Sequence, residues 1–280
     1  MIEVFAVFRR LTRNRAALLG VVIIGLIVLG AVTAPFFFPA SPWRLVGRPF
    51  LSPFQTWSQP LGTDALGRSI ISGIFYGARV SLLTGVAASA AALLVGVAVG
   101  TISGYRGGKL DDLLMRFTEV FQTIPPFLFA IVIVAIFSPK TATTIGAISV
   151  VSWPGAARLV RAETLRLRQS EFVQSCRVIG MSDTRIVLTQ ILPNCMAPII
   201  VMASVLVANA ILIESGLAFL GLGDPNMMSW GTMIGAGRSE LRNAWHVCVI
   251  PGAAVLFTVL SLNLVGDGLN DALNPRLRRS

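Results

Sequence analysis

Gly108 and Lys109 are the residues that most resemble a phosphate-binding loop, in which backbone N–H groups and a lysine hold nucleotide phosphates. Such a loop needs a serine or threonine directly after the lysine and a second glycine at a fixed spacing upstream. Leu110 stands in the hydroxyl position, and the upstream glycine is missing. The sequence therefore predicts no nucleotide site in this chain.

Gly221 to Asp224 reads Gly-Leu-Gly-Asp, the motif of intramembrane aspartyl proteases, and Asp267 offers a second carboxylate. Proteolysis of this kind needs two carboxylates close enough to share one proton. The two aspartates belong to different apolar segments, and spans that cross a bilayer would place them at opposite ends, about 30 Å apart. Pro225 also predicts a turn directly after Asp224. An aspartyl protease is therefore disfavoured.

Metal and thiol chemistry have few ligands to draw on. His246 is the one histidine, and it stands where an apolar segment begins. The three cysteines are scattered and form no CxxC pair, so neither a thiolate metal site nor a disulfide framework is predicted. They are Cys176, Cys195 and Cys248.

Four polar side chains fall within or near apolar segments: Glu119, Asn209, Glu214 and Asn263. Polar groups are costly to place in lipid, so such positions are candidates for lining a substrate path. The alternative is that neighbouring helices, or water at a helix end, satisfy them. That alternative applies above all to Glu119, which stands close to a basic segment.

The composition predicts a membrane protein. Hydrophobic residues make up 54% of the chain and charged residues 13%, against about 25% charged in soluble domains. A span needs about 20 mostly apolar residues, and we expect six, with the fourth the shortest. The expected spans are Ala16 to Phe38, Val80 to Tyr105, Leu113 to Phe137, Ala142 to Ala157, Ala197 to Leu222 and Val247 to Val265.

The distribution of basic residues predicts the orientation. Most of the 23 lysines and arginines lie in residues 9–15, 106–116, 158–185 and 276–279, which alternating spans would place on one side. This asymmetry is typical of cytoplasmic segments, so both termini are expected in the cytoplasm. It also explains the net charge of +10 without a nucleic-acid partner.

Residues 158–193 form an arginine-rich island between two apolar spans. Phe172, Cys176 and Ile179 recur at helical spacing, and Gly180 follows where a left-handed helix end would fall. Ser182 could begin a second helix that carries Ile186, Val187 and Ile191, and Pro193 would end it. We expect an amphipathic hairpin whose apolar stripe is covered by a partner protein. The alternative is a hairpin that lies on lipid headgroups or on its own bundle.

Small residues recur at every fourth position of the second expected span. Because lipid supplies no hydrophobic drive between helices, close backbone approach over small residues holds them together. This ladder predicts a helix–helix interface, within the chain or with a second membrane subunit. Its members are Ala88, Ala92, Gly96, Gly100 and Gly104.

The chain reads as one membrane domain. The first apolar run is too long for a signal-peptide core, so we expect it to stay as an anchor. The expected organisation is a cytoplasmic arm (residues 1–15) and a transmembrane domain (residues 16–280). Within the domain, residues 39–78 form a loop outside the cytoplasm and residues 158–193 a cytoplasmic loop.

Residues 171–194, EFVQSCRVIGMSDTRIVLTQILPN, resemble the cytoplasmic coupling loop of permease subunits in binding-protein-dependent ABC importers. Gln174, Ser175 and Cys176 stand where that family has a triplet of small residues. Further blocks resemble the C-type subunit of the dipeptide, oligopeptide and nickel branch. They are LGTDALGR (61–68), YGARVSL (76–82), FLGLG (219–223), SWG (229–231) and LVGDGLNDALNPRLR (264–278).

The resemblance implies an all-α type I ABC importer permease, similar to the methionine importer, in a bacterial inner membrane. It also implies a second, different permease subunit, two ATP-binding subunits that carry ATP and Mg²⁺, and a periplasmic or lipid-anchored substrate-binding protein. The chain itself would be neither an enzyme nor a cofactor protein. ATPase docking would fall to Glu171, Gln174, Ser175, Cys176, Gly180 and Arg185.

Two alternatives remain. Within the family, the substrate is expected to be a di- or oligopeptide, because few imidazole or thiolate ligands are available for nickel; chelated nickel stays open. Outside the family, the chain would be a self-contained secondary transporter. That class typically shows inverted repeats, and none is recognisable here. The docking hairpin would also have no purpose in it.

Overall fold

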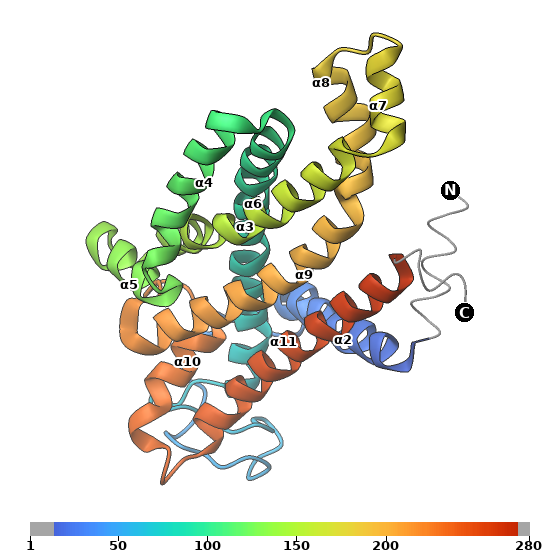
Figure 1. The fold of residues 1–280 in the computed structure, drawn as a ribbon. Helices are drawn as coiled ribbons and strands as arrows, with labels where there is room; N and C mark the ends of the chain where they lie inside the picture. Colours follow the sequence, from blue (N-terminus) through green and yellow to red (C-terminus); the bar gives the residue numbers. More distant parts are fainter. Residues whose placement is uncertain (1–13, 274–280) are drawn as a thin grey trace.

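The structure is a computed structural model that describes residues 14–273, and within this range every regular element is a helix. The long helices form a bundle, with α7 and α8 projecting at one end (Figure 1), which we call the hairpin end. The loop before α3 lies at the opposite end, the loop end. The helices are α2 (Arg15–Phe37), α3 (Ile70–Arg106), α4 (Gly108–Thr123), α5 (Pro126–Phe137), α6 (Thr141–Arg168), α7 (Glu171–Val178), α8 (Asp183–Ile186), α9 (Leu192–Leu217), α10 (Trp230–Gly237) and α11 (His246–Leu273).

The all-helical membrane class is confirmed. Helices α2, α3 and α11, and the helical stretch Asp183–Leu222, are long and apolar enough to cross a membrane. The pair α4 and α5 gives a fifth span if it is counted as one. The remaining expected span, residues 142–157, lies in α6, where serine, threonine and glycine dilute the apolar content. Residues 1–13 of the expected N-terminal arm, and the C-terminal arginines, lie outside the described range.

The third expected span, residues 113–137, is made of two helices with a bend between them. The chain bends by 81° between α4 and α5. Ile124 and Pro125 have extended backbones between the two helices, because the residue before a proline is kept out of the helical region. Helix α5 then begins at Pro126 and packs its buried Ala130 and Val134 into a cluster with α6.

The helices that contain the fourth and fifth expected spans begin or end beyond the expected bounds. Helix α6 continues through Pro154 and into the arginine-rich island as far as Arg168. At the other side of the hairpin, Pro193 does not end a helix. It stands in the first turn of α9, directly after the π-helical segment that joins α9 to α8, and the helical path continues through it.

At the far end of α9 the helical path reaches Leu222, the limit expected for the fifth span. The helical path continues past Ser215 and Gly216 through a π-helical segment, η2 (Ala218–Leu222). It breaks at Gly221, whose φ of 86° lies in the left-handed region. A second π-helical segment, η1 (Val187–Ile191), joins α8 to α9 without interruption.

The small-residue ladder of α3 faces α6 of the same chain. A Cβ atom on Gly96 would lie 2.5 Å from the Cβ of Ala156, and one on Gly104 would lie 2.8 Å from the backbone oxygen of Arg161. Ala92 is buried in a cluster with Trp153 and Ala157. The two backbones therefore touch along several turns, which fixes α3 against α6.

The loop end is a set of tight turns, and the loop ends earlier than expected because α3 begins at Ile70. The Asp64 carboxylate accepts hydrogen bonds from the backbone N–H groups of Leu66 and Arg68, at 2.9 and 2.8 Å. The hydroxyl of buried Thr63 bridges two further backbone groups. The LGTDALGR block therefore shapes this loop through its own backbone.

Candidate functional site

The hairpin at the hairpin end owes its shape to one glycine. Gly180 has a φ of 80°. Its N–H donates to the Arg177 oxygen at 2.9 Å, and the Met181 N–H donates to the Cys176 oxygen at 3.0 Å. These two bonds form the glycine-dependent helix ending expected from the sequence. Helix α8 then begins after Ser182, although no hydrogen bond from the Ser182 side chain caps it.

Most of the residues expected to dock a partner lie on the hairpin surface. Glu171, Gln174, Ser175, Gly180 and Arg185 are exposed. The sixth, Cys176, is half-buried and packs against the apolar cluster beneath the hairpin. The fold therefore presents five of the six on the outside of one projecting element.

Of the expected apolar positions, Phe172 and Ile179 are misplaced, whereas Ile186 and Ile191 of the second helix are buried as expected. The side chains that face inward are Val173, Ile186 and Ile191, all fully buried. Ile179, which the stripe included, is 76% exposed, and its neighbour Val178 is 87% exposed at the tip. Helix α7 has only eight residues, so one inward position per turn suffices to anchor it. Valine and isoleucine side chains are left free at the tip as a result.

Tyr105 ties the hairpin to the bundle, and sequence reasoning missed it. Its hydroxyl donates to the Asp183 carboxylate at 2.6 Å. The guanidinium of Arg177 lies over its ring, 5.4 Å from the centroid. A buried tyrosine usually finds a polar partner for its hydroxyl, so Tyr105 at the end of an apolar span was a signal. Its partner could be found only in three dimensions.

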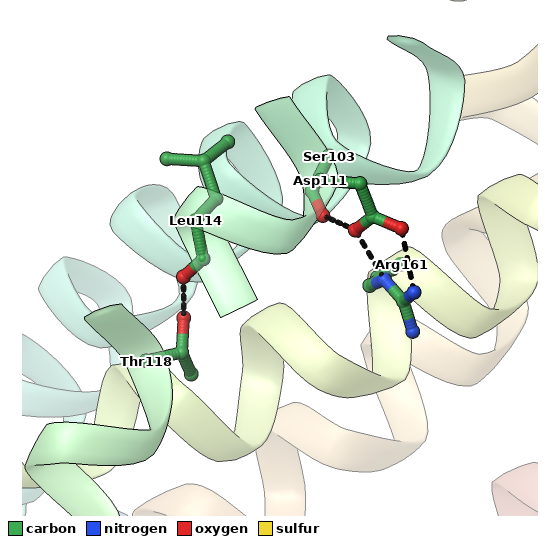
Figure 2. Close-up of polar contacts among 5 residues, drawn as sticks. All are labelled: Ser103, Asp111, Leu114, Thr118 and Arg161. Carbon is green, nitrogen blue, oxygen red and sulfur yellow. Dashed lines mark hydrogen bonds and ion pairs between the residues drawn. The ribbon is translucent and has the colours of Figure 1, made fainter. Parts of the chain in front are cut away.

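An ion pair fastens α4 to α6 beside the hairpin. The Arg161 guanidinium donates to both oxygens of Asp111, each at 2.6 Å, and the Ser103 hydroxyl of α3 also donates to Asp111 (Figure 2). In the same helix, the Thr118 hydroxyl donates to the Leu114 carbonyl (Figure 2). Two-point contact between arginine and carboxylate is among the stronger polar interactions. Three helices thus meet at one carboxylate.

Glu214 lies at the other end of α9 and is 6% exposed. It accepts hydrogen bonds from the Ser81 hydroxyl at 3.1 Å and from the Ser215 hydroxyl at 3.4 Å. The first of these joins α9 to α3. Glu214 also lines a cavity of about 10 Å³ with Thr84 and Asp224, room for about one water molecule. A neighbouring helix therefore contributes to satisfying this carboxylate.

The other polar candidates are not brought together with Glu214. Glu119, Asn209 and Asn263 are exposed, on α4, α9 and α11. No hydrogen bond among the described residues joins any of them to the Glu214 carboxylate. They stand on outward faces, where a partner subunit, lipid or a water-filled path would meet them.

Asp224 has a structural partner. Its carboxylate accepts from the Thr141 N–H and hydroxyl, both at 2.9 Å, at the start of α6. Burial raises the pKa of Asp224, but hydrogen bonds from Thr141 and Asn226 outweigh burial and hold that pKa below its ordinary value. The carboxylate thus stabilises a helix N-terminus as an anion. Asp267 forms no part of this arrangement.

The loop end carries a larger cavity of about 330 Å³. It lies between the loop before α3 and α10, and its charged lining residues are Asp64, Arg68, Asp224 and Arg238. The Arg68 guanidinium lies over Trp43, 4.6 Å from the ring centroid. The described residues have two ion pairs, and neither joins Asp64 to Arg68 or Arg79.

Comparison with known proteins agrees with this arrangement. Residues 96–279 match the family described as binding-protein-dependent transport system inner membrane component. Residues 6–64 match the N-terminal transmembrane domain of oligopeptide transport permease C. The fold is similar to a chain of the MetNI methionine ABC transporter, with a TM-score of 0.62 at 17% identity, over 72% of this chain and 96% of that chain.

Curated relatives cover nearly the whole chain. The di/tripeptide permease DppC of Pseudomonas aeruginosa is 38% identical over 274 residues, 95% of this chain and 90% of that protein. The oligopeptide permease OppC of Haemophilus influenzae is 36% identical over 275 residues, 96% of this chain and 88% of that protein. Permeases of this family work with ATPase and substrate-binding partners. This chain therefore belongs to the binding-protein-dependent inner membrane components, as a transport permease and not an enzyme.

Proposed function

We propose that this chain forms half of a membrane path through which a bacterium imports di- and oligopeptides. The assignment of peptides as the substrate rests on one observation: relatives that match nearly the full length of this chain are named as peptide permeases. Selectivity in such importers rests largely on the binding protein. A permissive path with a few carboxyl and amide groups suits hydrated peptides of varied sequence.

ATP hydrolysis by partner subunits would act on this chain through the hairpin. Helices α7 and α8 project from the bundle, with Val178 and Ile179 exposed at the tip and Arg185 exposed on α8. An exposed apolar group rimmed by polar residues is typical of a protein-binding surface. We assign Glu171, Gln174, Ser175, Cys176, Gly180 and Arg185 to ATPase docking. ATP and Mg²⁺ would be bound by the ATPase subunits.

The helices on either side of the hairpin would carry its movement across the membrane. Two residues, Gln169 and Ser170, separate α6 from α7, and α8 runs through η1 into α9. Helix α9 reaches Glu214 near the loop end, and α6 is fixed to α3 along the small-residue ladder. Closure of the ATPases would therefore shift α6 and α9 as stiff levers, exchanging an outward opening for an inward one.

The partners and the path follow from the exposed faces. A second homologous permease would cover the exposed faces that bear Glu119, Asn209 and Asn263, so that these residues and Glu214 line the path between the subunits. We place the hairpin and both termini in the cytoplasm, because basic residues mark that side. The loop before α3 would then meet a periplasmic or lipid-anchored binding protein at the inner membrane.

Nickel chelates are the second candidate substrate. Their ligands travel with the metal, so the path needs no metal-binding side chains of its own. The test is uptake in cells that lack this chain. We expect lost growth on peptides as the only amino-acid source, with normal nickel accumulation and rescue by a plasmid copy. The opposite pattern, normal growth on peptides and lost nickel accumulation, would contradict the peptide assignment.

A further inference from the structure

The hairpin has one hydrogen bond to a helix distant in sequence. Within the described range, its other backbone and side-chain bonds reach at most five residues along the chain. The exception joins the Tyr105 hydroxyl to the Asp183 carboxylate at 2.6 Å. The bond ends on the first residue of α8 and starts on the last turn of α3. Among the described residues it is therefore the one hydrogen bond between the hairpin and a third long helix, α3.

The tyrosine ring strengthens this link from the other side. Tyr105 is 7% exposed and belongs to the cluster that buries Val173 of α7 and Ile186 of α8. The Arg177 guanidinium, in the last turn of α7, lies over the ring at 5.4 Å from its centroid. A guanidinium in this position is attracted by the negative face of the aromatic ring. One side chain of α3 thus contacts both helices of the hairpin.

Helix α3 is suited to carry movement to the other end of the molecule. It runs unbroken from Ile70 to Arg106 and contains no proline. Near its loop end, the Ser81 hydroxyl donates to buried Glu214 of α9. At its hairpin end it carries Tyr105. A displacement of the hairpin would therefore reach the loop end through α3 as well as through α6 and α9.

We infer that Tyr105 is a positioning residue for energy coupling: with Asp183 and Arg177 it forms a latch that makes α3 move with the hairpin. The inference rests on the proposed docking of ATPases to the hairpin. The latch acts after docking, since Tyr105 is buried beneath the hairpin and away from its exposed surface. Its loss should leave the ATPases bound but separate ATP hydrolysis from transport.

The test uses the complete importer in proteoliposomes, with peptide uptake and ATP hydrolysis measured together. Tyr105→Phe removes only the hydroxyl, and uptake per ATP hydrolysed is expected to fall about tenfold, the factor that corresponds to one hydrogen bond to a charged group. Asp183→Asn keeps an acceptor oxygen and should lower the ratio less than Asp183→Ala. The double variant Tyr105→Phe/Asp183→Ala should be no worse than the more severe single variant.

Tyr76→Phe is the matched control. Tyr76 is the other tyrosine of the chain, lies on the same helix, and donates its hydroxyl to the Phe38 carbonyl at 2.8 Å, far from the hairpin. This variant should keep the wild-type ratio. A wild-type ratio in Tyr105→Phe would overturn the latch, as would a loss of ATPase co-purification in that variant. Absence of ATP-driven peptide uptake by the wild-type complex would instead overturn the proposed function.

Discussion

Gly180→Val changes the hairpin without creating a clash. A Cβ atom at Gly180 would meet no atom within 4 Å, and the residue is exposed, so the cost lies in the backbone alone. Gly180 has a φ of 80°, in the left-handed region that costs an L-residue about 1–2 kcal/mol, and a β-branched residue more. The expected strain is therefore about 2–3 kcal/mol.

The hairpin can release that strain only by abandoning its turn. This would break the bonds from Gly180 to Arg177 and from Met181 to Cys176, and would displace the exposed tip. If the whole strain energy is lost from the free energy of ATPase binding, the affinity for the ATPases falls about 30- to 150-fold, since 1.4 kcal/mol corresponds to a factor of ten. The rest of the bundle should remain folded, because the strained residue contacts none of it.

Co-purification of the ATPase subunits from detergent measures this effect, with membrane insertion and peptide uptake followed in parallel. Gly25→Val is the matched control, since Gly25 also has no atom within 4 Å of an added Cβ but has an ordinary helical backbone in α2. The control should retain ATPases and uptake. Normal ATPase recovery and uptake in Gly180→Val would refute the assignment of the hairpin as the docking element.

Three further perturbations test the fold around the site. Gly96→Leu places a side chain against Ala156, 2.5 Å away at the first carbon, and should lower stability by about 1–3 kcal/mol in a detergent melting assay; an unchanged Tm would contradict the α3–α6 contact. Asp111→Ala strands Arg161 and should cost about 2–3 kcal/mol, with Asp111→Asn less severe; equal effects would argue against the ion pair. Asp224→Ala should lower the Tm, because the ionised Asp224 carboxylate stabilises the fold at pH values above its unfolded-state pKa of about 4. The Tm difference between wild type and variant should narrow as the pH falls through the lowered pKa of folded Asp224. A Tm difference that does not depend on pH would count against an ionic role.

The membrane class and the hairpin were predictable from local chemistry. Apolar runs and a glycine after a helical pattern are each properties of neighbouring residues. Gly180 has the left-handed backbone expected of it. Helix boundaries were less predictable, because proline has opposite meanings in different places. Pro193 opens α9 and Pro154 lies inside α6, whereas Pro125 and Pro126 mark a bend of 81°.

The partners in the polar contacts of the site could be identified only from the folded structure. Asp111 and Arg161 are 50 residues apart, and Tyr105 and Asp183 are 78 residues apart. Nothing in the spacing of such residues pairs them. Burial within the hairpin was also misjudged, because a helix of eight residues can anchor through Val173 and leave Ile179 outside. Sequence pattern gives the face of a long helix better than that of a short one.

We propose that this chain passes peptides only when ATPases act on its hairpin. The direct measurement is peptide uptake into proteoliposomes holding this chain with its partner permease, the ATPases and the binding protein, compared with this chain alone. We expect uptake by the complete importer when ATP is present on the side of the membrane that holds the ATPases. We expect no uptake by this chain alone under any ion gradient. Gradient-driven uptake by the chain alone, without ATP, would contradict the account and favour a secondary transporter.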